Sequence, residues 1–263
     1  MPNLEHHSAT EITSLNCEGC RNPGLLPFEF TMAFQPIVDV RTLRPVAYEA
    51  LVRGRDGESA ASILSQVDDS NRYRFDQACR VKAIELAVRL GLGKHDDCKL
   101  SINFLPNAVY RPASCIRATL EATERFGLSH SRLIFEVTEG EKVRDSAHLQ
   151  SIFEEYKRHG MMTAIDDFGA GYAGLNLLAQ FQPHIIKMDM ELTRGIADDP
   201  VRQAIVEAVC LACKKLGIRI IAEGIETQSE ADLLTELGVT WHQGYLYAKP
   251  EIEALRLLHG NFA

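Results

Sequence analysis

The chain has 263 residues, of which 46% are hydrophobic and 24% are charged, and this composition is ordinary for a globular protein. Its formal net charge of −8 argues against bulk electrostatic attraction to nucleic acid or to an anionic membrane surface. The sequence has no apolar run long enough to span a membrane and no signal-peptide pattern, so we expect a cytoplasmic protein without nucleic-acid or membrane partners.

Residues 1–27 are polar and are expected to form a flexible N-terminal arm, followed by one domain over residues 28–263. The arm contains a CxxC pair, Cys17 and Cys20, in a polar turn where neither cysteine needs burial. The pair could form a zinc or redox site, although two cysteines do not complete a four-ligand site. Binding of a metal, redox chemistry and no role at all stay open for this pair.

Short apolar runs and amphipathic stretches alternate after the arm. Eight runs rich in Ile, Val, Tyr and Phe predict strands at 30–39, 45–53, 98–104, 132–139, 162–169, 184–190, 218–225 and 242–248. Helical patterns between them predict helices at 74–92, 107–128, 147–160, 199–217 and 228–238.

This alternation predicts an α/β fold, and eight such units in about 250 residues predict a closed TIM-type (β/α)8 barrel rather than an open sheet. The first two strands are joined only by residues 40–44, a connection too short for a parallel crossover. We therefore expect the first strand of the barrel to be antiparallel to its neighbour.

Asp166 and Asp167 stand side by side at the end of a predicted strand, in the string TAIDDFGAGYAGL. Adjacent residues of a strand point to opposite faces, so one of the two carboxylates should be buried. Burying an unpaired carboxylate costs several kcal/mol, so the pair needs a cation close by. The simplest such cation is a hard divalent metal, which prefers oxygen ligands.

Polar residues also fall in or at the end of seven of the predicted strands. They are Glu49, Asn103, Glu136, Asp166, Asp167, Lys187, Glu223 and Gln243. A single acid at a strand end is as often a helix cap, but barrel enzymes collect their catalytic groups from several strand ends. Oxygen ligands without His or Cys select Mg²⁺ or Mn²⁺, and five acids are enough for two ions that share an aspartate. Such a pair of ions could activate water for phosphodiester hydrolysis.

The chain from about residue 28 onward resembles the EAL-domain family, phosphodiesterases that linearise cyclic di-GMP. The resemblance lies in seven strings in order: YEALVRG (48–54), SINFLP (101–106), FEVTE (135–139), DDFGAGY (166–172), KMD (187–189), AEGIET (222–227) and QGYLYAKP (243–250). It implies hydrolysis of cyclic di-GMP to linear 5′-pGpG with one or two Mg²⁺ or Mn²⁺ ions. It also implies a barrel with an antiparallel first strand and a homodimer formed by helices near the glycine-rich loop.

The resemblance assigns catalytic roles to Glu49, Lys187 and Glu223. Lys187 would hold the attacking water, Glu223 would help to activate it, and Glu49 would bind a metal. The implied ligands of one ion are Glu49, Asn103, Glu136 and Asp166, and those of the second are Asp166, Asp167 and Glu223. A lysine beside bound cations is expected to have a lowered pKa.

The resemblance also implies contacts outside the metal ligands. Arg53 would bind a substrate phosphate, for which a guanidinium offers paired donors, and Gln35 and Gln243 would line the substrate and metal site. Three further acids are implied to support the site: Glu139, which would anchor the loop after the paired aspartates, Glu226 and Asp189.

The sequence departs from the family pattern at several positions. Ala170, Ala173 and Gly174 replace the Thr and Ser residues common in the loop after the paired aspartates, which removes hydroxyls but no metal ligand. Lys249 replaces an arginine, and residues 54–67 lack the Trp and His-Pro common there. The contacts to guanine and the effect of the altered loop therefore stay undetermined.

Two other functions are compatible with parts of this pattern. A catalytically inactive cyclic di-GMP receptor would share the fold, but such proteins typically lose several metal ligands, whereas this chain keeps every candidate. A Schiff-base aldolase could use Lys187 as its nucleophile, but it has no need for five clustered acids.

Overall fold

The computed structural model describes residues 26–94, 97–140, 146–171 and 174–256. The CxxC pair of the predicted arm lies outside these residues. Nine strands are present in the described part of the chain: β1 (Thr31–Asp39), β2 (Arg44–Arg53), β3 (Lys99–Asn103), β4 (Leu133–Thr138), β5 (Met162–Phe168), β6 (Ile185–Met188), β7 (Arg219–Ala222), β8 (Trp241–His242) and β9 (Glu251–Ile252).

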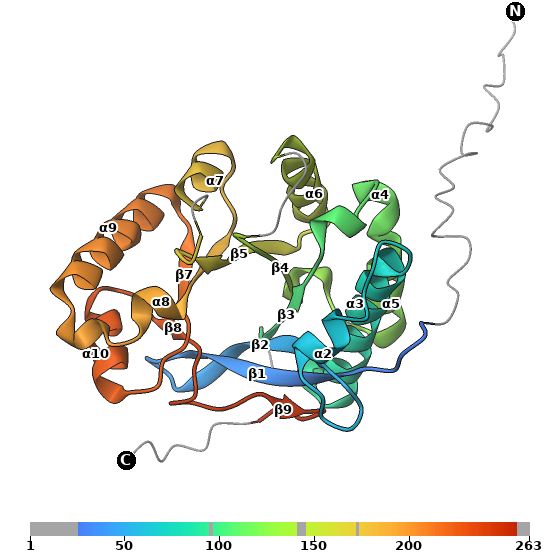
Figure 1. Ribbon diagram of the computed structural model, residues 1–263, viewed down its shortest axis with the longest axis horizontal. Helices are drawn as coiled ribbons and strands as arrows, with labels where there is room; N and C mark the ends of the chain where they lie inside the picture. Colours follow the sequence, from blue (N-terminus) through green and yellow to red (C-terminus); the bar gives the residue numbers. More distant parts are fainter. Residues whose placement is uncertain (1–25, 95–96, 141–145, 172–173, 257–263) are drawn as a thin grey trace, which may run out of the picture.

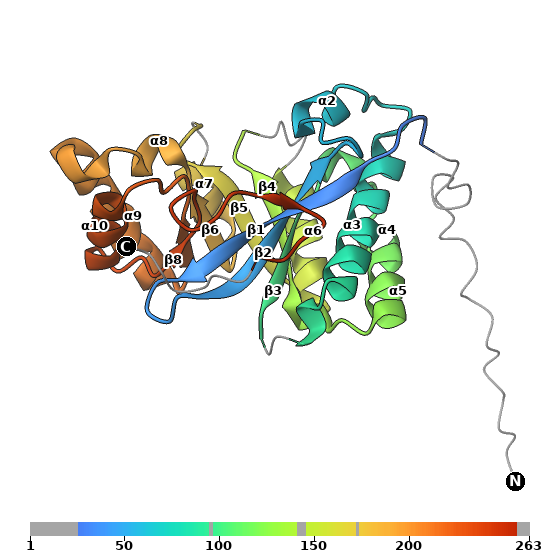
Figure 2. The same ribbon diagram turned by 90° about the horizontal axis from the view of Figure 1, so that it is seen from below.

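The strands close into a barrel, as the sequence predicts (Figure 1). β2 to β8 are parallel neighbours in chain order, and β1 closes the ring by pairing with both β2 and β8. Both pairings of β1 are antiparallel, because the turn between β1 and β2 is too short for a crossover. The predicted antiparallel first strand is therefore confirmed. The short β9, which the sequence did not predict, runs antiparallel beside β1 (Figure 2).

Helices surround the barrel and bury its outer face (Figure 1). The α-helices of the described residues are α2 (Ala60–Leu64), α3 (Arg72–Arg89), α4 (Pro112–Cys115), α5 (Arg117–Phe126), α6 (Ser146–Arg158), α7 (Gly174–Gln180), α8 (Met190–Thr193), α9 (Pro200–Leu216) and α10 (Gln228–Glu236). Short 3-10 helices, η1 (Leu92–Lys94), η2 (Pro106–Ala108), η3 (His130–Arg132) and η4 (Ile196–Asp198), complete the connections. No helix of the described segments combines the length and the apolar character needed to cross a membrane.

Two predicted elements differ most from the structure. The helix expected at 107–128 is divided into η2, α4 and α5, because Pro112 cannot continue a helix and instead begins α4. The strand expected at 242–248 ends at His242. Beyond it, the N–H of Leu246 donates to the carbonyl of Ile225 instead of to a strand, and Gly244 packs so tightly that a Cβ there would lie 2.1 Å from the same carbonyl oxygen.

The barrel interior has an apolar layer that lies directly beneath a polar one. The apolar layer consists of Ile37, Ala47, Ile134, Ala164, Ile185, Ile221 and Trp241. Side chains two residues apart on a strand share a face, so the next inward positions toward the carboxyl ends are Gln35 on the reversed β1, then Glu49, Glu136, Asp166, Lys187, Glu223 and Gln243. The candidate site therefore lies above the apolar layer, at the carboxyl ends of the strands, where barrel enzymes have their active sites.

Candidate metal centre

Lys187 lies at the centre of the polar layer. Its side chain is only 1% exposed, and its ammonium forms ion pairs with four carboxylates from four other strands or strand ends. The distances from Lys187 Nζ are 3.2 Å to Glu49 Oε2, 3.1 Å to Glu136 Oε2, 3.0 Å to Asp166 Oδ1 and 2.9 Å to Glu223 Oε1. The three N–H groups of one ammonium cannot satisfy four carboxylates, and four ionised carboxylates around one ammonium give the site an excess of negative charge.

The pKa values of the site follow from burial and from the charges around each group. Burial alone would lower the pKa of Lys187, but the surrounding carboxylates, Asp166 first, raise it well above its usual value. The expected lowering of this pKa refers to the protein with bound cations and stays a prediction, because without cations the acids dominate. Burial raises the pKa of Glu136 to about 8 and that of Glu223 well above its usual range, in both cases against the effect of Lys187.

The carboxylates of Asp166 and Asp167 lie on the same side of β5, although adjacent residues of a strand normally face opposite sides. The pairing of β5 with β6 shifts register between Ile165 and Phe168, and Asp167 has a φ of 54°, which few non-glycine residues adopt. This irregularity turns the carboxylate of Asp167 toward Asp166 and Glu223 instead of to the opposite face. Burial and the charge of Asp166 raise the pKa of Asp167 to about 6.

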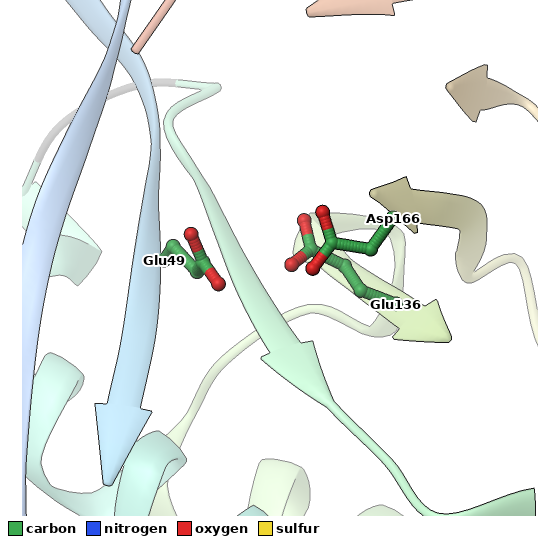
Figure 3. A group of neighbouring side chains, drawn as sticks. All are labelled: Glu49, Glu136 and Asp166. Carbon is green, nitrogen blue, oxygen red and sulfur yellow. The ribbon is translucent and has the colours of Figure 1, made fainter. Parts of the chain in front are cut away.

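The carboxylates form two groups that share Asp166. One consists of Glu49, Glu136 and Asp166, whose side chains converge in Figure 3, and the other of Asp166, Asp167 and Glu223. Within each group one oxygen per residue lies within 4.8 Å of the others. Asp166 Oδ1 is buried and, among the described residues, forms no hydrogen bond of good geometry even though Lys187 is 3.0 Å away. An all-oxygen donor set of this charge fits hard divalent cations such as Mg²⁺ or Mn²⁺.

Amide side chains orient Glu49. The Asn103 amide donates to Glu49 Oε1 at 2.9 Å, and the Gln243 amide donates to Glu49 Oε2 at 2.7 Å and to Gln35 Oε1 at 3.2 Å. The amide of Gln35 in turn donates to the carbonyl of Ala248. The structure thus brings together every residue that the sequence placed on a strand end, and Gln35 of β1, which the resemblance implied, lies beside them.

Glu139 joins both ends of the loop after the paired aspartates. Its carboxylate accepts the N–H of Gly169 at 2.8 Å and that of Gly174 at 2.7 Å. A Cβ at Gly171 would lie 2.8 Å from Glu139 Oε1, and one at Gly174 would lie 2.8 Å from the ring of Phe168. A side chain at position 174 would therefore require Phe168 or Glu139 to shift.

We expect Glu139→Ala to lower activity or divalent-metal affinity by about 10- to 100-fold, as is common for residues that orient metal ligands. The substitution frees the two glycine N–H groups and loosens the loop that begins directly after Phe168. Titration of Mn²⁺ into the variant by calorimetry, with turnover measured alongside, tests this expectation. Metal affinity and turnover both equal to wild type would contradict an anchoring role.

Three other sequence-predicted residues lie outside the carboxylate cluster. Arg53 is half-buried at the end of β2 and donates to the carbonyl of Val52 at 2.7 Å. Asp189 is buried and caps α8 by accepting the N–H of Glu191. Glu226 is exposed and forms an ion pair with Arg194, so the structure does not bring it to the metal groups.

Sequence reasoning missed residues that hold these side chains in place. Ser101 donates a hydrogen bond to Glu136, and its position two residues before Asn103 on the same strand face could have indicated this. Glu230 accepts the N–H groups of Gly195, Glu226 and Thr227 and thereby fixes the chain after Glu223. The Thr-x-x-Glu pattern that begins at Thr227 is a capping box and was a usable signal.

A cavity of about 360 Å³ opens beside the carboxylates, between the carboxyl ends of β2 and β3 and the helices α2 and α3. Glu49, Asn103 and Asp166 form its polar side, and apolar side chains such as Leu64 and Phe75 form the opposite wall. The cavity therefore has charged side chains on one side and apolar side chains on the other.

A family model described as "EAL domain" matches residues 26–250. Among curated relatives, the blue light- and temperature-regulated antirepressor BluF of Escherichia coli is 33% identical over 223 residues, which cover 85% of this chain and 55% of BluF. A cyclic di-GMP phosphodiesterase of Pseudomonas aeruginosa is 29% identical over 235 residues, which cover 84% of this chain and 38% of that protein. The chain thus spans about half or less of the length of these relatives.

Solved structures resemble the whole barrel. A standalone versatile EAL protein of Vibrio cholerae, crystallised in a c-di-GMP bound form, is 52% identical with a TM-score of 0.86, and the match covers 90% of this chain and 99% of that one. BlrP1 of Klebsiella pneumoniae, in a manganese/cy-diGMP complex, is 36% identical with a TM-score of 0.81, and the match covers 90% of this chain and 60% of that one.

Proposed function

The chain belongs to the EAL domain family, and we propose that it is a metal-dependent phosphodiesterase that hydrolyses cyclic di-GMP to linear 5′-pGpG. The observation that carries this proposal is the convergence of five carboxylates, one amide and one lysine on a single barrel rim, in two groups that share Asp166. The relative from Pseudomonas aeruginosa named a cyclic di-GMP phosphodiesterase and the c-di-GMP bound structure from Vibrio cholerae support the substrate.

The metal ligands we propose are those of the two groups together with Asn103. Mg²⁺ or Mn²⁺ bound there would lower the pKa of a coordinated water and neutralise charge on the phosphate. A manganese complex with cyclic di-GMP is known for the BlrP1 relative, which supports this choice. The donors present, oxygen atoms of carboxylates and an amide, agree with the same choice.

Lys187 and Glu223 are the groups we assign to the attacking water. The ammonium of Lys187 is held in place by four carboxylates. Bound cations would take over part of the charge of these carboxylates, and an N–H group of Lys187 would then be able to donate to the water oxygen. Glu223 Oε1 lies 2.9 Å from Lys187 Nζ, so this carboxylate lies beside the place where Lys187 would hold the water. It can therefore accept the proton that the water loses on attack.

The cavity beside Glu49 is where we place the substrate. A base of the dinucleotide would lie against the apolar wall, while a phosphate would lie at the carboxylate rim. Arg53 stands at the end of β2 beside this cavity and can release the carbonyl of Val52 to bind a phosphate. Gln35 and Gln243 would complete the polar lining.

A catalytically inactive receptor is the second candidate, and the antirepressor name of BluF is the observation that favours it. Calorimetric binding of cyclic di-GMP in chelator, followed by incubation of the complex with Mg²⁺ or Mn²⁺, separates the two functions. An enzyme binds the ligand and then consumes it when the metal is added. Stable binding without loss of ligand after metal addition would establish the receptor and overturn the enzyme.

The carboxylates around Lys187 argue against the Schiff-base alternative. A nucleophilic lysine must lose its proton, whereas four carboxylates hold the ammonium of Lys187 and raise its pKa. The proposed role of Lys187 therefore uses its charge and its N–H groups.

We also propose that the chain forms a homodimer through α7 and α9. Apolar side chains are exposed along α9, at Val201, Ile205 and Leu211, and Leu175 at the start of α7 is 67% exposed. α7 and α9 follow the neighbouring strands β5 and β6, and α7 begins at Gly174, which Glu139 binds. A partner on this surface would therefore lie close to the loop after the paired aspartates. A cytoplasmic location stays a prediction.

We expect wild-type protein to sediment as a dimer at micromolar concentration, and the double variant Ile205→Asp, Leu211→Asp to sediment as a monomer. Two carboxylates placed in an apolar contact would have to be buried without partners. The matched control is Glu207→Gln on the same helix, which should leave the dimer intact. A monomeric wild type, or a double variant that remains dimeric, would contradict this surface.

A further inference from the structure

Arg80 of α3 is a fully buried arginine outside the metal groups. Its side chain has no solvent exposure, and its Nη2 lies 2.8 Å from Asp76 Oδ2, one helical turn earlier. Its Nη1 donates to the hydroxyl of Tyr156 on α6 at 2.8 Å. Burial raises the pKa of Asp76, and the charge of Arg80 acts against that rise. The pair is thus two opposite charges removed completely from water.

Three aromatic rings surround the guanidinium. Its central carbon lies 5.0 Å from the ring centre of Phe135, 5.6 Å from that of Phe104 and 5.7 Å from that of Tyr156. The Phe104 ring also packs edge-on against those of Phe135 and Tyr156. Cations at these distances are attracted to ring faces, and the attraction is larger without water. Arg80 therefore holds parts of β4, α6 and the end of β3 around one point.

The two phenylalanines are direct neighbours of proposed metal ligands. Phe104 follows Asn103, and Phe135 precedes Glu136, while Asn103 and Glu136 themselves are paired across β3 and β4. Adjacent residues on a strand face opposite sides, so the rings point outward to Arg80 while the ligand side chains point into the barrel. Arg80 thus contacts the reverse side of the two strand ends that carry these ligands.

Asp76 fixes the same region through the backbone. Its Oδ1 accepts the N–H of Leu105 at 2.9 Å, two residues beyond Asn103. The N–H of Phe104 donates to the carbonyl of Glu136 at 3.0 Å, so the chain on both sides of Phe104 is held. Asp76 also lines the cavity that Glu49 and Asn103 border. The end of β3, the wall of the cavity and the ion pair of Asp76 with Arg80 are therefore connected to one another.

A buried ion pair is weak support for stability, because apolar residues of the same volume often serve as well or better. Hydrogen bonds and ion pairs do, however, fix the orientation of the groups they join, which apolar packing does not. We propose that Arg80 and Asp76 are a positioning pair that fixes Asn103 and Glu136 for metal binding from outside the barrel. This inference rests on the proposed metal-dependent function and names two residues that are not themselves metal ligands.

The test is the affinity of the full chain for Mn²⁺ alone, measured by calorimetry in Arg80→Lys. Lysine keeps the charge opposite Asp76 but loses the planar group that binds Tyr156 and covers three rings. We expect Mn²⁺ affinity about 10-fold weaker than wild type, as for other residues that support metal ligands. At saturating Mn²⁺ we expect turnover to recover, because the variant retains every ligand.

Two further variants keep the result interpretable. Val206→Ala, which trims a buried side chain of α9 across the barrel (Figure 1), lowers stability without touching the ion pair of Asp76 with Arg80 and should leave Mn²⁺ affinity unchanged. Tyr156→Phe keeps the ring and removes only the hydroxyl, and it should weaken Mn²⁺ binding in the same direction by a smaller factor. It carries the test alone if the lysine variant does not fold.

The outcomes separate this inference from the proposed function. Wild-type affinity for Mn²⁺ in folded Arg80→Lys and Tyr156→Phe would overturn the positioning role while leaving the enzyme intact. Equal weakening in Val206→Ala would also overturn it, because the effect would then follow stability alone. A wild type that binds no Mn²⁺ would overturn the proposed metal site itself and the positioning role with it.

Discussion

Replacing Glu49 by alanine is expected to lower hydrolysis of cyclic di-GMP by at least about 1,000-fold, because several kcal/mol of transition-state stabilisation depend on correctly held metal. The fold should remain within about 1 kcal/mol of wild type when metal is absent. Removal of one carboxylate relieves repulsion around Lys187, which offsets the loss of the hydrogen bonds from Asn103 and Gln243. Product formation and a thermal melt in chelator measure the two effects.

The matched control for this variant is Glu121→Ala, which removes a carboxylate from the exposed face of α5. It should change neither turnover nor the melt. Retained metal-dependent turnover in Glu49→Ala would overturn the assignment of Glu49 as a ligand. A large loss of stability in the same variant would show that Glu49 mainly stabilises the fold.

Lys187→Met is expected to lower stability strongly, unlike Glu49→Ala, and also to lower activity. Without the ammonium, the buried carboxylates repel each other, and removing one partner of a buried charge pair typically costs about 3–5 kcal/mol. Hydrolysis should fall by about 100-fold or more, because the water loses the group that holds it. Denaturant unfolding in chelator and in Mn²⁺, together with turnover, tests both parts.

Added Mn²⁺ should restore much of the stability of Lys187→Met but not its turnover. Divalent charge can replace the ammonium as the counter-ion of the carboxylates, whereas it cannot replace the lysine N–H groups at the water. A variant that is as stable as wild type in chelator would show that Lys187 does not neutralise the cluster. Full activity of the variant in Mn²⁺ would show that Lys187 has no role in the reaction.

The barrel and its rim of acids were predictable because both follow from strand periodicity. A carboxylate two positions beyond an apolar inward residue, as Glu136 is beyond Ile134, must lie on the same face at the strand end. The antiparallel first strand followed from the length of one turn. Each of these conclusions needs only local sequence and the geometry of parallel strands.

The features that escaped prediction depend on contacts between distant segments. The positive φ of Asp167 needs the irregular pairing of β5 with β6, which no residue type signals. In the sequence, Arg80 is one of several charged residues in an amphipathic helix, which indicates an exposed side chain. Its burial is explained only by the rings of Phe104 and Phe135, which contact its guanidinium in the structure. The early end of β8 depends on the close approach of Gly244 to Ile225.

The most direct measurement of the proposed function is the fate of cyclic di-GMP mixed with the full chain, followed by chromatography and mass spectrometry over time. We predict that linear 5′-pGpG accumulates as the first product in Mg²⁺ or Mn²⁺ and that chelator stops its formation. Cyclic di-GMP that stays intact in both metals would contradict the enzyme, and GMP formed without 5′-pGpG as its precursor would contradict the proposed reaction.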